Sequence, residues 1–145
     1  MSDMEQLMDM AKEFHRENVA TYAVSEEKVR KFMELALSGR GGIIGVIGDQ
    51  GALEAAIYLL ISTHWYSDAW HLEELINFVR PAFRKSNNAK ELIAFAKRCA
   101  DELEIPLAIG VISNIRTAAK IRLYERQLAK PAGAFFVYTP GVVNG

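Results

Sequence analysis

The run of residues best suited to chemistry is the basic, asparagine-rich segment 84–89, which lies just before a strongly amphipathic stretch. A helix N-terminus presents unpaired N–H groups and about half a positive charge, so it is a ready site for a phosphate. A loop that gathers successive N–H groups around an anion usually needs residues that tolerate a positive φ, as Asn87 and Asn88 do. Arg84 and Lys85 add positive charge at its mouth. The segment therefore predicts either a phosphate-binding loop or an ordinary helix cap beside two solvated cations.

A second group of side chains with chemical potential is His64, Trp65 and Tyr66, which fall in a predicted loop. Aromatic loop residues commonly bind ligands, so they predict the lining of a substrate pocket. Cys99 falls on the apolar side of a predicted helix, where we expect it to pack rather than react. The histidines show no helical i, i+4 pairing, and the sequence predicts no metal site.

Composition limits the classes of partner. The 145 residues fit a single domain, residues 1–145, and the net charge of −1 creates no field that would attract nucleic acid or a membrane. Any anion site must therefore be local. The N-terminus lacks the features of a signal peptide, and no apolar run reaches the length of a membrane span. We expect a cytoplasmic protein that binds neither nucleic acid nor membrane.

The elements before the phosphate loop follow from hydrophobic periodicity. Apolar residues recur with helical spacing over 4–11, and again over 29–36 after Ser25 as N-cap. Two apolar runs separated by a turn then predict a hairpin, and a further strand stops before Pro81. The predicted strands are 43–47, 52–61 and 71–79.

The elements after the loop alternate between helix and strand. The clearest helix is predicted over 89–103, where one face is apolar and the other charged. A strand over 107–112, a helix over 115–128 and a last strand over 134–138 follow. The order ααβββαβαβ predicts an α/β fold with a mixed sheet and helices on both faces.

The segment around the loop resembles the cofactor motif of the GNAT acetyltransferase superfamily, V-x-P-x-x-R-x-x-G-x-G/A. Val79, Pro81, Arg84 and Ala89 match it, and Asn87 stands where the family usually has its central glycine. The order of elements also agrees over roughly residues 24–138, although the family's usual first strand is missing. The pattern looks closest to small members of phage or prophage type.

The resemblance implies acetyl-CoA as cosubstrate. In such enzymes the strand before the loop splays from the next strand, and the pantetheine arm lies between them, paired here with the backbone of residues 77–79. The N–H groups of residues 84–89 would hold the pyrophosphate. Asn114 would cap the following helix, alone or while also touching the cofactor. The expected cofactor-binding residues are Asn77, Phe78, Val79, Arg84, Lys85, Ser86, Asn87, Asn88, Ala89 and Asn114.

The resemblance also suggests catalytic residues. Tyr124 lies on the last helix like the family tyrosine that gives a proton to the departing thiolate, and a phenol can serve as general acid. Glu73 is the favoured general base, because some relatives carry a glutamate at this place. Side chains alternate along a strand, so Glu74 should face the opposite way. Glu74, His64 and a water are the alternatives for the base.

The predicted function is transfer of an acetyl group from acetyl-CoA to a primary amine by direct attack. The acceptor would be a small-molecule or peptide amine, whose identity the sequence does not give. The alternative is a catalytically silent module of the same fold that binds acyl-CoA or a partner protein. A homodimer formed through the final strand is compatible with such folds.

Overall fold

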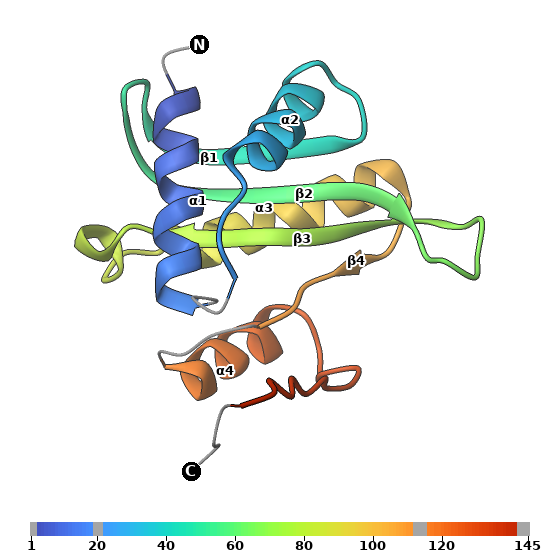
Figure 1. The fold of residues 1–145 in the computed structure, drawn as a ribbon. Helices are drawn as coiled ribbons and strands as arrows, with labels where there is room; N and C mark the ends of the chain where they lie inside the picture. The colour runs from blue at the N-terminus through green and yellow to red at the C-terminus, as the bar shows by residue number, and fades with distance from the viewer. Residues whose placement is uncertain (1–2, 19–21, 112–115, 142–145) are drawn as a thin grey trace.

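A four-stranded mixed sheet, with helices on both faces, forms the centre of the computed structural model, which describes residues 3–18, 22–111 and 116–141 (Figure 1). The strands are β1 (Gly42–Asp49), β2 (Ala52–Thr63), β3 (Trp70–Val79) and β4 (Leu107–Ala108), and they lie in this order across the sheet. The first three form an antiparallel meander, and β4 pairs with β3 in parallel. The predicted hairpin and third strand are therefore confirmed.

The helices are α1 (Met4–Asn18), α2 (Glu26–Leu37), α3 (Asn88–Leu103) and α4 (Thr117–Gln127). In Figure 1, α1 and α2 lie in front of the sheet, α3 lies behind it, and α4 lies below β4. The side chain of Ser25 accepts a hydrogen bond from the Lys28 N–H, which confirms the predicted N-cap. None of the helices in the described segments is long and apolar enough to cross a membrane.

The centre of the core is β2, which is buried on both faces. Ala56 and Tyr58 pack in one cluster with α1 and α2, whereas Ile57 and Leu59 pack in the other cluster with α3. A strand covered on both sides reads as a continuous apolar run, as residues 55–61 do. The hydroxyl of Tyr58 donates to the main-chain oxygen of Leu7, so α1 is fixed to the sheet.

The pairing of β3 with β2 contains a β-bulge at Leu75. Tyr58 pairs with Ile76, but Leu59 pairs with Glu74, so Leu75 has no partner of its own on β2. An extra residue of this kind breaks the strict alternation of side chains along a strand. Glu74 and Asn77, three residues apart, consequently project from the same face of the sheet.

The parallel pairing of β3 with β4 is short. It covers only Leu72 with Leu107 and Glu73 with Ala108. From Glu74 to Val79, the outer edge of β3 has no strand partner among the described residues. The predicted splay between these strands is therefore present, although β4 is shorter than the predicted strand 107–112.

The predicted last strand is wrong. Residues 134–138 form no strand in this structure, and the apolar side chains there are exposed, Phe136 to 94% and Tyr138 to 80%. Their β-type composition depends on a neighbouring strand to pair with, because strand propensity reflects packing against neighbours. Since β4 ends after two residues, this segment has no adjacent ladder to join.

Candidate active site

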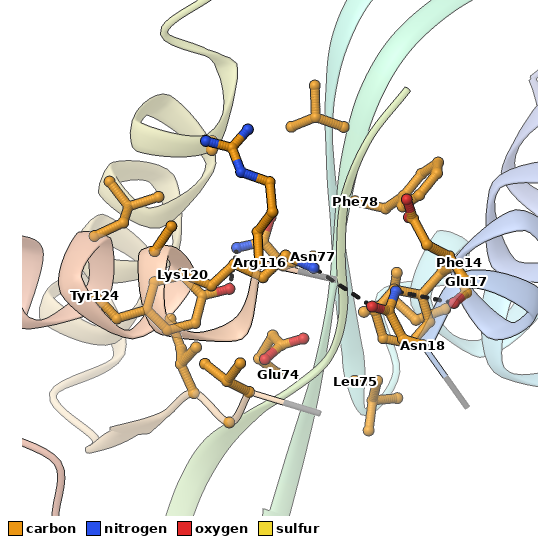
Figure 2. Close-up of a pocket in the computed structure, with 18 of the residues that line it drawn as sticks. Phe14, Glu17, Asn18, Glu74, Leu75, Asn77, Phe78, Arg116, Lys120 and Tyr124 are labelled. Carbon is orange, nitrogen blue, oxygen red and sulfur yellow. Dashed lines mark hydrogen bonds between the residues drawn. The ribbon is translucent and has the colours of Figure 1, made fainter. Parts of the chain in front are cut away.

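A cleft of about 780 Å³ opens along the unpaired edge of β3. Residues from the C-terminal turn of α1, from β3, from the loop before α3, from the segment after β4 and from α4 line it. Figure 2 shows side chains from α1 on one side of β3 and side chains from α4 on the other. The volume lies within the range typical of ligand pockets, roughly 300–1,000 Å³.

Three side chains meet inside this cleft: Glu74, Asn77 and Tyr124 (Figure 2). The amide nitrogen of Asn77 donates to the phenol oxygen of Tyr124 at 3.1 Å. Burial raises the pKa of Tyr124, and the nearby carboxylate of Glu74 raises it further. The phenol is therefore protonated at neutral pH, as a proton donor must be.

The carboxyl of Glu74 has an unusual environment for an acid. Burial raises the pKa of Glu74 to about 7, and the charge of Glu73 acts in the same direction. A hydrogen bond with the Gly110 main chain opposes the shift. A carboxyl whose pKa lies near neutrality can both take and give a proton under physiological conditions.

The sequence favoured Glu73, but the structure directs Glu74 toward Tyr124. The Glu73 side chain borders the cleft from the opposite face of β3, is half exposed, and lies 3.7 Å from the Nε2 of His71. The bulge at Leu75 explains the difference, because strict alternation would have put Glu73, and not Glu74, on the face of Asn77.

The phosphate loop has a different conformation from the predicted one. A short 3-10 helix, Pro81–Phe83, leads into it. Asn87 has a φ of −85°, and only Glu104 and Arg116 combine a side chain with a positive φ in the described segments. The expectation that asparagine supplies left-handed backbone here is wrong, because consecutive tight turns after Pro81 already redirect the chain. The acceptor of the Asn88 N–H at the start of α3 is the Ser86 hydroxyl, and not the side-chain carbonyl of an asparagine.

Only part of the loop faces the cleft. Arg84, Ser86 and Ala89 line it, whereas Lys85, Asn87 and Asn88 do not. Asn88 is buried instead, and its amide donates to the Glu54 carboxylate at 3.0 Å.

Some main-chain N–H groups of residues 84–89 already have acceptors in the described part of the protein, and others do not. The N–H groups of Arg84 and Ser86 donate to the carbonyls of Pro81 and Phe83 in the preceding 3-10 helix, at 3.4 and 3.3 Å. Those of Lys85, Asn87 and Ala89 donate to no acceptor in the described segments. The prediction that all six amides would converge on one anion is therefore not met.

Arg84 is held by the protein itself. Its two terminal nitrogens donate to the two carboxylate oxygens of Glu17 at 2.6 and 2.7 Å, and its Nε donates to the Val79 carbonyl at 3.0 Å. The guanidinium also lies over the Phe78 ring, 5.4 Å from the ring centre. This pairing lowers the pKa of Glu17, chiefly through the hydrogen bond from Arg84.

Sequence reasoning found Tyr124 on α4 but missed the polar side chains that α1 and the N-terminal end of α4 contribute. Glu17 and Asn18 enter the cleft from the last turn of α1, and Arg116 and Lys120 enter it from α4 (Figure 2). Arg116 and Lys120 stand four residues apart, a spacing that predicts one shared face of a helix, although in the structure Arg116 is the left-handed N-cap of α4 and only Lys120 lies within the helix. That spacing was the available signal, but an i, i+4 pair of cations is also common on solvated helix faces.

The other predicted residues lie apart from the cleft or beyond the described segments. The ring of His64 stacks on His71 with 4.1 Å between ring centres, and Trp65 is 96% exposed. His64, Trp65 and Tyr66 line a separate hollow formed by the β2–β3 loop. Asn114 lies outside the described residues.

Solved structures share the fold of this chain. An acetyltransferase from Trypanosoma brucei superposes with a TM-score of 0.69 at 13% identity, covering 95% of this chain and 93% of its own. AAC(6')-Iy, solved in complex with the bisubstrate analogue CoA-S-monomethyl-acetylneamine, gives 0.68 at 15% identity, covering 97% and 92%. The ribosomal-protein-alanine N-acetyltransferase from Brucella melitensis biovar Abortus 2308 gives 0.66 at 14% identity, covering 94% and 90%. The chain has the GNAT acetyltransferase fold.

This likeness concerns the fold, since the identities are low. No protein-family model matches the sequence, and no curated protein is similar to it. Within the GNAT acetyltransferase fold, the chain spans nearly the full length of these three structures.

Proposed function

We propose that this protein is an N-acetyltransferase that moves an acetyl group from acetyl-CoA to a primary amine. The observation that carries the proposal is the meeting of Glu74, Asn77 and Tyr124 in a cleft beside the unpaired edge of β3. A carboxyl with a pKa of about 7 and a protonated phenol form an acid–base pair suited to amine acylation. The acetyltransferase fold supports the same reaction class.

The residues of the cleft fit an acyl-CoA. The free edge of β3 offers main-chain groups with which the amides of an extended arm can pair, in the manner of an added strand. At the end of the cleft near α3, Ser86 and Ala89 border it, and the Ala89 N–H has no acceptor in the described part of the chain. Such groups at a helix start suit a diphosphate.

Each side chain then has a defined role. Bound acetyl-CoA supplies a thioester carbonyl and, once the acetyl group leaves, a thiolate. The Glu74 carboxylate takes a proton from the incoming ammonium, which frees the lone pair that forms the new C–N bond. The Tyr124 hydroxyl gives its proton to the thiolate as the C–S bond breaks, and the second proton that the nitrogen loses on becoming an amide restores the phenol. Asn77 orients that hydroxyl through the bond to its oxygen.

The deciding experiment measures release of free coenzyme A thiol from acetyl-CoA over a panel of amines. We expect turnover with the wild-type chain and a strong loss in Tyr124→Phe. Tyr138→Phe is the matched control, because Tyr138 is 80% exposed and lies outside the cleft.

Calorimetry together with the thiol assay distinguishes this enzyme from a catalytically silent module that only binds acyl-CoA. An enzyme binds acetyl-CoA and turns it over, whereas a silent module binds it without releasing thiol in the presence of any amine. Absence of binding would contradict both readings of the cleft.

A further inference from the structure

The most informative contact outside the acid–base group joins Glu17 of α1 to Arg84 of the phosphate loop. The carboxylate receives both terminal nitrogens of the guanidinium, and both residues line the cleft. Paired N–H groups of arginine bind the oxygens of carboxylates and phosphates with the same geometry. Glu17 therefore presents to Arg84 the same kind of partner that a phosphate ligand would.

Two more cations stand across the cleft from Glu17. Lys120 reaches from α4 to α1, where its Nζ donates to the Asn18 side chain at 3.4 Å (Figure 2). Arg116 lies one turn before it and also lines the cleft. Burial is the main cause that lowers the pKa of Lys120. The charges of Arg84 and Arg116 lower it further, and the carboxylate of Glu17 raises it. Three cations, Arg84 of the loop and Arg116 and Lys120 at the N-terminal end of α4, thus line the same cleft as this one carboxylate.

One ion pair with Glu17 requires only one cation, whereas these three cations line this cleft. Like charges brought together are costly unless an anion lies between them, and one carboxylate carries a single negative charge. A diphosphate carries more charge and more acceptor oxygens. Arg84 also keeps its bond to the Val79 carbonyl, so the guanidinium stays at the cleft when the carboxylate leaves it.

We propose that Glu17 occupies, with its own carboxylate, part of the site for the diphosphate of the acyl donor, and that Arg84, Arg116 and Lys120 together hold that anion once Glu17 yields it. The inference rests on the proposed function and adds to it two ligand-binding residues of α4 and an internal competitor on α1.

The test is a set of affinities measured by calorimetry at one low ionic strength. The probes are coenzyme A, inorganic pyrophosphate, and pantetheine, which lacks phosphate. In Glu17→Gln the competing charge is gone and the shape is kept. We expect coenzyme A and pyrophosphate to bind roughly three- to tenfold more tightly, the effect of losing one partly exposed ion pair, with pantetheine unchanged. Glu13→Gln removes the same charge one turn earlier on α1, outside the cleft, and should change no affinity more than about twofold.

Lys120→Gln and Arg116→Gln provide an independent arm. Each should weaken coenzyme A and pyrophosphate by roughly three- to tenfold and leave pantetheine unaffected. The inference is overturned if folded Glu17→Gln binds both phosphate probes no more tightly than the wild type, or if both α4 variants bind them normally. Failure of the wild type to bind coenzyme A and pantetheine would instead remove the proposed function, while the pyrophosphate arm would still decide the anion site.

Discussion

The side-chain amide of Asn77 on β3 donates to the phenol oxygen of Tyr124 on α4, with 3.1 Å between the two atoms. This bond crosses the cleft and joins two elements that share no strand pairing. It fixes the direction of the one hydroxyl that the proposed chemistry needs as a proton donor.

Removal of the phenol hydroxyl should affect turnover far more than binding. In Tyr124→Phe we expect kcat to fall by roughly 10²-fold or more, the usual contribution of a general acid. The dissociation constant of acetyl-CoA should change less than about threefold, because Phe retains the ring. Steady-state kinetics and calorimetry on the same preparation check both values. Unchanged turnover would make Tyr124 a packing residue.

Asn77 should act through Tyr124 alone. Asn77→Ala should lower kcat by about 3- to 10-fold, the equivalent of one hydrogen bond, with little change in KM. In the Tyr124→Phe background the same substitution should have almost no further effect, because the bond it would break is already absent. Additive losses in the double variant would show that Asn77 acts elsewhere.

The two adjacent glutamates should give different pH profiles. Since Glu74 must lose its proton to act as base, kcat/KM should rise with pH through about 7 and then level off. Glu74→Gln should lower kcat roughly 10²-fold and abolish this limb. Glu73→Gln should keep the limb and move it to lower pH, because the Glu73 charge helps to raise the pKa of Glu74. The reverse pattern would restore Glu73 as the base.

The raised pKa of Glu74 also predicts a stability effect. The folded state holds the proton up to about pH 7, whereas the unfolded chain loses it near the ordinary value of 4.5. Folding stability therefore falls as pH rises from about 4.5 to 7, by roughly 1–3 kcal/mol. Glu74→Gln should lack this loss, so the variant should gain stability over the wild type at pH 8 but not at pH 4. Urea unfolding at the two pH values measures the difference.

The finding that residues 134–138 form no strand and are exposed can be tested by comparing substitutions of two phenylalanines. Phe136 is 94% exposed, and Phe136→Ser should change the free energy of unfolding by less than about 0.5 kcal/mol. Phe78 is buried in the core beside α1, and Phe78→Ala should cost about 3–5 kcal/mol. A large cost at Phe136 would indicate that the segment packs in solution as the sequence predicted.

Much of the framework could be predicted from the sequence because its signals are local. The spacing of apolar residues is sufficient to place α1, α2 and α3, and the continuous apolar run of β2 identifies a strand covered on both faces. Ser25 could be recognised as a cap for the same reason, since its bond reaches only three residues along the chain. The position of Tyr124 on a late helix was also recoverable.

The features that only the tertiary structure decided depend on pairings between distant segments. A single extra residue, Leu75, in the ladder between β3 and β2 exchanges the faces of Glu73 and Glu74, and no local pattern marks it. Glu17 and Arg84 are 67 positions apart in the chain, so the local sequence around either residue does not predict their contact. The last strand failed for the same physical reason, because an extended segment becomes a strand only when a neighbouring strand offers its free N–H and C=O groups.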